Sequence, residues 1–92
     1  MSYPTTTDFI AGLIFFAREY CKISRAQFAG DLDISYQNLW DIEDGRHKVT
    51  GEYLDFIIEK LPLTPFEFWA LVPRYIKYLK KLEAKTKTQK IN

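Results

Sequence analysis

The side chains that most often do covalent or metal chemistry, thiols and imidazoles, are scarce in this chain. Its 92 residues include one cysteine, Cys21, and one histidine, His47. A catalytic nucleophile needs an oriented base, and His47 lies in a basic loop with no evident partner beside Cys21 or a serine. A metal site needs several such ligands, and a lone cysteine forms no internal disulfide. We therefore expect no enzyme activity, no metal site and no cofactor, and we assign Cys21 a structural role.

Capping residues divide the segment between Ile23 and Gly45 into two short predicted helices. Ser24 can cap the first helix, and Gln27 stands where it can bond back, which is the reciprocal pattern of a capping box. Ser35 can cap the second helix, and Gly45 is suited to end it. The inward positions of both helices are apolar, namely Phe28, Ala29, Leu32, Ile34, Leu39 and Ile42. Two helices joined this closely must cross steeply, which is typical of a helix-turn-helix whose second helix enters a DNA major groove.

Apolar residues at helical spacing predict a helix on each side of this pair. A first helix is expected at about residues 7–21, where it offers a face against which the pair can pack. After a polar loop, Thr50 is a candidate cap for a fourth helix, which Pro62 ends. The buried side of this fourth helix is predicted to consist of Tyr53, Leu54, Ile57, Ile58 and Leu61.

Two further helices are predicted in the C-terminal third. Residues 64–67, TPFE, combine a capping box with proline at the favoured first position, and they begin a fifth helix. Pro73 either begins a sixth helix or kinks the fifth, the helix that follows is basic, and the last segment, TKTQKIN, is predicted to be frayed. Since no strand alternation, repeat or linker is evident, we expect an all-α bundle of five to six helices that ends in a basic helix.

Charge is distributed unevenly along the chain, although its net value is only +1. Residues 1–73 carry six Lys or Arg and eleven Asp or Glu, a net charge of −5, whereas residues 74–92 carry seven Lys or Arg and one Glu, a net charge of +6. Any affinity for nucleic acid must therefore come from the local placement of charge.

The composition favours one folded domain, since 47% of the residues are hydrophobic and 16% are aromatic. No stretch is long enough to span a bilayer, and the N-terminus lacks the order of a secretory signal, so we expect a cytoplasmic protein without a membrane partner. We divide the chain into a helix-turn-helix domain at residues 1–72 and a basic C-terminal helix with a frayed tail at residues 73–92.

Three motifs in fixed register resemble those of the Cro and phage-repressor family of helix-turn-helix domains, often called XRE-like. Residues 23–29, ISRAQFA, are similar to the family's L-S-Q-x-x-L-A signature, residues 33–35, DIS, to its G-V-S turn, and residues 42–46, IEDGR, to its I-E-N-G-K closure. The resemblance extends over about residues 9–69. It implies a lambda-repressor-like fold with the helix-turn-helix at residues 24–44.

The resemblance also implies a recognition helix at residues 35–44 and gives roles to its outward side chains. The implied base-reading residues are Tyr36, Gln37, Trp40 and Asp41. Gln37 can make a bidentate contact to adenine, and Tyr36 can donate to a base or phosphate or cover a thymine methyl group. The implied contacts to the DNA backbone are Ser24, Arg25, Ser35, Asn38, Arg46, His47 and Lys48.

Two further roles follow from the resemblance. Arg18 and Glu43 match positions that the family often pairs, so Glu43 is assigned to a structural ion pair, with a plain exposed carboxylate as the alternative. Asp33 stands where the family has a turn glycine, which is tolerable because Asp adopts the left-handed region more readily than most residues.

Two features leave alternatives open. One is a set of four large apolar residues within six positions, which could be core or a dimer surface: Phe66, Phe68, Trp69 and Leu71. The other is the basic sixth helix, which could be a solvated face, an arm along DNA phosphates or a helix on a membrane surface.

The pattern as a whole predicts a DNA-binding transcriptional regulator of bacterial or phage type, a repressor that binds a palindromic operator as a homodimer. Its expected partners are double-stranded DNA and a second copy of the chain. The alternative is a helix-turn-helix fold used for protein contact, such as an antirepressor or an antitoxin-like partner. The acidic residues 1–73 and the outward Trp40 and Asp41 motivate this alternative.

Overall fold

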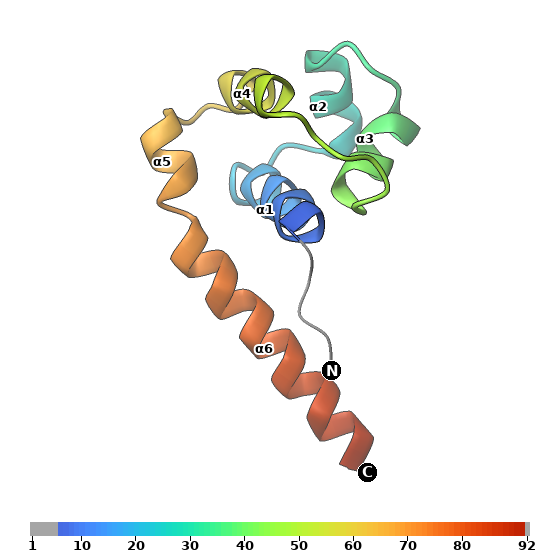
Figure 1. Cartoon of the computed structure of the whole chain (residues 1–92), viewed down its shortest axis with the longest axis vertical. Helices are drawn as coiled ribbons and strands as arrows, with labels where there is room; N and C mark the ends of the chain where they lie inside the picture. The colour runs from blue at the N-terminus through green and yellow to red at the C-terminus, as the bar shows by residue number, and fades with distance from the viewer. Residues whose placement is uncertain (1–5, 92) are drawn as a thin grey trace.

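The computed structural model describes the backbone of residues 6–91 and the side chains of residues 7–85. The described chain is all-helical. Its helices are α1 (Thr6–Tyr20), α2 (Arg25–Asp31), α3 (Tyr36–Glu43), α4 (Gly51–Lys60), α5 (Pro65–Trp69) and α6 (Val72–Ile91). In Figure 1, α1 lies at the centre, α2 and α3 lie together on one side of it, and α4 leads through α5 to the long α6. No helix within the described range is long and apolar enough to cross a membrane.

Four of the helices begin at a hydroxyl cap, as the sequence predicts. The capping oxygens of Ser24, Ser35, Thr50 and Thr64 each accept a hydrogen bond from the backbone N–H three residues later, at 3.0 to 3.1 Å. The return bond of a capping box forms at α5, where Glu67 Oε1 accepts from the Thr64 N–H at 2.9 Å. At α2 the predicted return bond from Gln27 is wrong. A neutral amide oxygen is a weaker acceptor than a carboxylate, and water competes for it at this exposed position.

The first three helices end in the same local motif. The residues Lys22, Asp33 and Gly45 lie in the left-handed region, with φ of 59°, 58° and 79°. After each, the next backbone N–H returns to the carbonyl five residues earlier, at 2.9 to 3.2 Å, which is the Schellman pattern. The prediction that Asp33 takes the left-handed turn is confirmed. The turn between α2 and α3 is thus closed by its own backbone.

The core lies between α1 and the helices around it. Leu13, Ile14 and Ala17 of α1 are fully buried, and the predicted inward residues of α2 and α3 join them. Ile34 is half-buried, as are Tyr53 and Leu54 at the start of α4. The remaining predicted core residues of the fourth helix are buried: Ile57, Ile58 and Leu61.

The structure divides the four apolar residues around α5. Phe68 is fully buried and Leu71 is 4% exposed, so both belong to the core and the interpretation of them as a dimer surface is wrong. A short helix alternates its faces within a few residues, which sends their neighbours outward. Phe66 is 82% exposed and Trp69 is 45% exposed, and these two keep the alternative of a contact surface open.

α6 begins at Val72, one residue before Pro73, and its first turns pack on α1. Tyr75 is 4% exposed, and its ring centroid lies 5.1 Å from that of Phe9 and 5.5 Å from that of Phe16. Farther along, α6 projects past α1 (Figure 1) and remains helical through Ile91, where the sequence predicts a frayed tail. Asn92 of that segment lies outside the described residues.

Gly12 of α1 lies against Tyr75 of α6. A Cβ atom at Gly12 would clash with the Tyr75 hydroxyl oxygen and would lie 2.8 Å from its ring carbon Cζ. We predict that Gly12→Ala lowers the free energy of unfolding by about 1 to 3 kcal/mol, the usual cost of overpacking, which shifts the midpoint of urea unfolding.

The matched control is Gly30→Ala in α2, where no atom lies within 4 Å of the new Cβ. There the substitution should raise stability by up to about 1 kcal/mol, because alanine is the better helix former. Equal effects of the two substitutions would contradict the close approach of Tyr75.

Candidate nucleic-acid interface

α3 is held by its inner face and presents its opposite side to solvent. Ser35 caps its start, Gly45 ends it, and Leu39 and Ile42 are buried against α1 and α2. We call the opposite side the outer face of α3, and its residues are Tyr36, Gln37, Trp40 and Asp41. Tyr36 and Gln37 are exposed, while Trp40 and Asp41 are half-buried.

A buried ion pair fixes α3 to α1. Arg18 Nε lies 2.7 Å from Glu43 Oε2, and Arg18 Nη2 donates to Glu43 Oε1 at 3.1 Å. Both side chains are only 3% exposed, so the contact is bidentate and shielded from water. The expected pairing of Arg18 with Glu43 is therefore present, and the alternative of an exposed carboxylate is excluded.

The same arginine also holds the chain where α2 begins. Arg18 Nη1 donates to the backbone oxygen of Ile23 at 2.7 Å and to Glu19 Oε2 at 3.0 Å. Ile23 directly precedes the cap residue Ser24, so one guanidinium sets the end of α1, the start of α2 and the position of α3. The guanidinium carbon of Arg18 lies over the Phe15 ring, 5.5 Å from its centroid.

Arg25 extends this cluster to the outer face. Its Nε donates to Glu43 Oε1 at 3.0 Å, and its Nη1 lies 3.3 Å from the Tyr36 hydroxyl. Burial lowers the pKa of Arg25, but its hydrogen bonds to Glu43 and Tyr36 outweigh that effect and raise the pKa overall. The family resemblance implies a contact between Arg25 and the DNA backbone. In the structure it links α2 to α3, with its guanidinium over the Tyr36 ring.

On the outer face, Asp41 joins two residues that the sequence assigned to different roles. Gln37 Nε2 donates to Asp41 Oδ1 at 3.0 Å, one helical turn away. His47 Nε2 lies 3.5 Å from Asp41 Oδ2. The Asp41 side chain is 19% exposed. Sequence reasoning expected Gln37 and Asp41 to contact bases separately, and it missed that they contact each other.

A second pair covers the end of α3. Arg46 Nε donates to Asp44 Oδ2 at 2.8 Å, and the Arg46 guanidinium carbon lies 5.0 Å from the centroid of a Trp40 ring. The hydrogen bond from Arg46 to Asp44 raises the pKa of Arg46. The Trp40 ring is thus partly covered by a cation.

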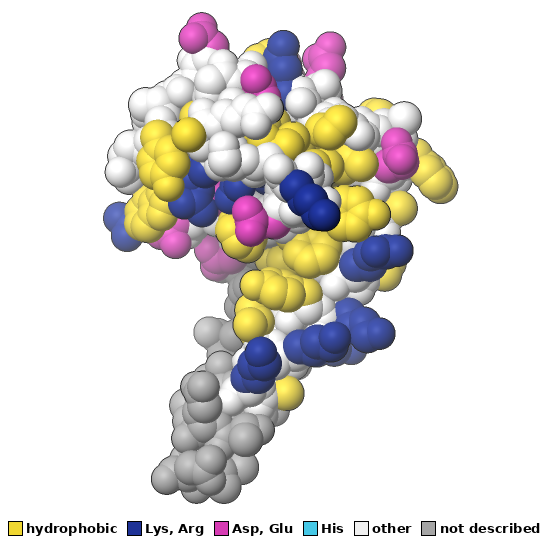
Figure 2. Space-filling model, turned by 180° about the vertical axis from the view of Figure 1, so that it is seen from behind, with side chains coloured by type: hydrophobic (Ala, Val, Ile, Leu, Met, Phe, Trp, Pro, Cys, Tyr) yellow, Lys and Arg dark blue, Asp and Glu magenta, His cyan; other side chains and the backbone are white. Residues whose placement is uncertain are grey.

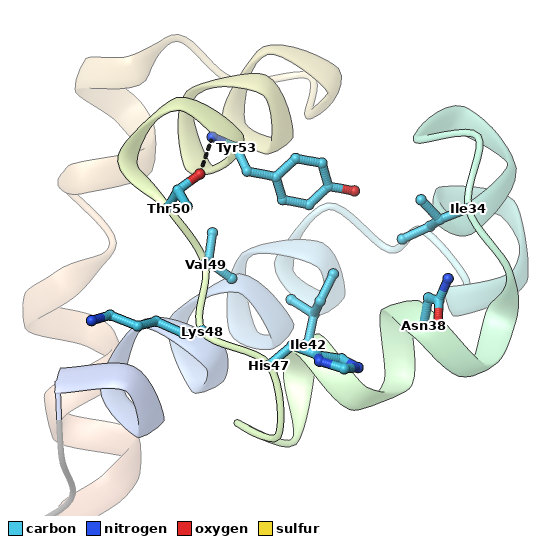
Figure 3. A pocket seen from close by; sticks show the side chains of 8 residues that line it. All are labelled: Ile34, Asn38, Ile42, His47, Lys48, Val49, Thr50 and Tyr53. Atoms are coloured by element: carbon cyan, nitrogen blue, oxygen red, sulfur yellow. Dashed lines mark hydrogen bonds between the residues drawn. The ribbon is translucent and has the colours of Figure 1, made fainter.

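Beside α3 lies a groove of about 460 Å³, shown in Figure 3. Its lining residues come from α3, from the loop after it and from α4: Ile34, Asn38, Ile42, His47, Lys48, Val49, Thr50 and Tyr53. The Tyr53 ring reaches across the groove toward Ile34 and Asn38, whereas Lys48 points away from it. Burial raises the pKa of Tyr53. Sequence reasoning missed Tyr53 as a surface residue, because its helical spacing is that of a core position.

The remaining residues implied for the DNA backbone keep exposed hydrogen-bonding groups. Ser24 and Ser35 each use a hydroxyl lone pair for capping, which leaves their O–H groups to donate. Asn38 and Lys48 are exposed at the rim of the groove.

Cys21 is a free cysteine, and its side chain is half-buried. Burial, followed by the negative charge of Glu67, raises the pKa of the Cys21 thiol, which makes it a poorer nucleophile. Within the described part of the chain, no three or more His, Cys, Asp and Glu side chains are grouped so that they could hold a metal ion.

The buried ion pair of Arg18 and Glu43 is expected to contribute strongly to the free energy of unfolding. Glu43→Gln leaves the Arg18 guanidinium buried without its counter-charge, and the expected loss is about 3 to 5 kcal/mol of unfolding free energy. A double-mutant cycle of Glu43→Gln with Arg18→Met, followed by urea unfolding, should show strong coupling between the two sites.

The exposed pair of Arg46 and Asp44, whose side chains are 64% and 47% exposed, is the matched control. The corresponding cycle of Arg46→Met with Asp44→Asn should show little coupling, since water screens this contact. If both cycles gave the same small coupling, Arg18 would not hold α3 in place.

No family model matches the chain, and no curated protein or solved structure matches it either. The resemblance to the Cro and phage-repressor family therefore depends on the motif residues of the chain itself.

Proposed function

We propose that this protein is a sequence-specific DNA-binding transcriptional regulator of the lambda-repressor-like helix-turn-helix type. It represses by occupying a palindromic operator as a homodimer. α2 crosses the DNA backbone, and α3 enters the major groove with Tyr36 and Gln37 toward the base edges. A two-fold arrangement follows because one helix of eight residues contacts few base pairs, and two half-sites multiply the specificity.

The observation that carries this proposal is the way in which α3 is held. The buried Arg18–Glu43 pair and two core side chains fix its inner face, while Tyr36 and Gln37 stay exposed at its N-terminal end. Direct readout of bases requires polar side chains on an element whose position is already fixed, because each hydrogen bond depends on geometry. The motif resemblance of residues 23–46 supports the same use of α3.

Base contact by Gln37 is an exchange of partners. In the free protein its amide donates to Asp41, and on DNA the amide pairs with the N6 and N7 atoms of adenine. Asp41 Oδ2 keeps His47 Nε2 as a neighbour at 3.5 Å when Gln37 leaves. At a wrong base Gln37 retains its hydrogen bond to Asp41, so only the correct base draws the amide away.

The proposal predicts that Gln37→Ala reduces discrimination at one base pair per half-site by about 1 to 3 kcal/mol. The preferred duplex would first be obtained by selection from a random pool. Competition binding against single-base variants of that duplex then measures the change. Selection also reports the half-site spacing, which should be close to one helical turn for a dimer.

Gln27→Ala is the matched control, because Gln27 is also an exposed glutamine but lies on α2. It should change affinity equally for all sequences, if it changes affinity at all. If the Gln37→Ala variant kept the same base-pair preference, Gln37 would not contact a base.

A second candidate, contact with another protein through α3, is favoured by the internal pairing of charges beside the outer face. Asp41 lies against His47, and Asp44 lies against Arg46. Residues 1–73 carry a net charge of −5 in addition. Affinity for DNA grows with cations that can neutralise phosphates, whereas a protein partner can use Trp40 and Tyr36 directly.

A salt titration separates the two functions. A labelled random duplex is titrated with the protein at several ionic strengths, from about 50 mM upward. DNA binding predicts a straight decline of log affinity against log salt, with a slope of about −0.9 for each phosphate neutralised. A slope near zero, or no binding at the lowest salt, would favour contact with a protein.

A further inference from the structure

An acidic, partly apolar groove lies between α4 and α5, on surface that the proposed DNA contact does not use. It has a volume of about 390 Å³, and its lining residues are Asp55, Ile58, Glu59, Leu63, Pro65 and Trp69. Asp55 and Glu59 are exposed and stand one helical turn apart on α4, with Ile58 between them. Trp69 leaves 45% of its surface exposed there. The groove therefore suits a ligand that combines an apolar side chain with two cations.

α6 presents this combination on its outward side. Ile76 is 39% exposed, and Lys77 and Lys80 are exposed on the same side of the helix. We call these three residues the α6 strip. Figure 2 shows lysine and arginine side chains along α6 with hydrophobic side chains among them. An arm that served DNA phosphates alone would need the cations but not an exposed isoleucine, so the strip is better suited to a protein surface.

The strip cannot reach the groove of its own chain. α5 packs against α4, and α6 then runs away from α4 and crosses α1 (Figure 1), with Tyr75 against Gly12. No ion pair joins α6 to Asp55 or Glu59 among the described residues. The complementary charges of one molecule therefore point to a second copy of the same chain.

We propose that two copies of this chain associate by exchange, with the α6 strip of each copy seated in the α4–α5 groove of the other. Ile76 packs against Leu63 and Trp69, and Lys77 and Lys80 pair with Asp55 and Glu59. Each copy donates one strip and receives one, so the contact is made twice around a two-fold axis and the dimer is closed. This contact deepens the proposed function by naming its dimer interface, but it requires no DNA.

The test uses two charge-reversed variants and light scattering without DNA. Lys77→Glu with Lys80→Glu reverses the strip, and Asp55→Lys with Glu59→Lys reverses the groove. The unchanged protein should be dimeric and should dissociate as salt rises. Each variant alone should dissociate at least tenfold more readily, because both of its contacts become repulsive. An equimolar mixture of the two should regain the dimer, since both contacts between unlike variants are attractive.

Lys85→Glu is the control, because it reverses a charge on α6 about two helical turns beyond Lys77, away from the strip, and it should leave the dimer intact. Circular dichroism confirms that each variant is folded. A monomeric unchanged protein, or a mixture that stays monomeric, would overturn the proposal. So would strip variants that keep their dimeric mass but lose affinity for DNA, which would assign the lysines to phosphates. Because no DNA is present, failure here leaves the Gln37 experiment unaffected.

Discussion

One buried guanidinium connects the parts of this fold that lie far apart in the sequence. Arg18 makes two hydrogen bonds to Glu43 on α3, one to the Ile23 carbonyl before α2 and one to Glu19 on its own helix. Removing such a charge from water costs several kcal/mol, which only a complete set of partners offsets. The arrangement of α1, α2 and α3 is therefore specific, because a displaced α3 would leave Arg18 buried without its carboxylate.

Much of the architecture could be predicted from the sequence because its signals are local. Hydroxyl caps, the left-handed turn at Asp33 and the ends of the helices each depend on a few neighbouring residues. The outward side chains were harder to assign, because several partners suit the same group. Arg25 can bind a phosphate or Glu43 with equal chemistry, and only the folded chain brings Glu43 within 3.0 Å. The burial of Phe68 beside the exposed Phe66 likewise depends on where α5 meets the core.

The outer face of α3 carries side chains suited to nucleic acid, but these side chains already form hydrogen bonds within the protein. Gln37 and Tyr36 are held by Asp41 and Arg25 and so are ordered before any partner arrives. Preorganisation lowers the entropy lost on binding, but breaking these pairs costs part of the gain. The internal hydrogen bonds at α3 therefore favour selective binding over high affinity. Its affinity would then depend on having two copies bind together.

The contact between Gly12 and Tyr75 has a consequence for how this sequence can vary. The two positions lie on the first and last helices, yet the space left by the missing Cβ of Gly12 is the space that the Tyr75 hydroxyl fills. A substitution at one of these two positions therefore affects which residues the other can hold. In a set of related chains, a larger residue at the first position should be accompanied by a smaller one at the second. Such paired changes would indicate that α6 packs against α1 in those chains as well.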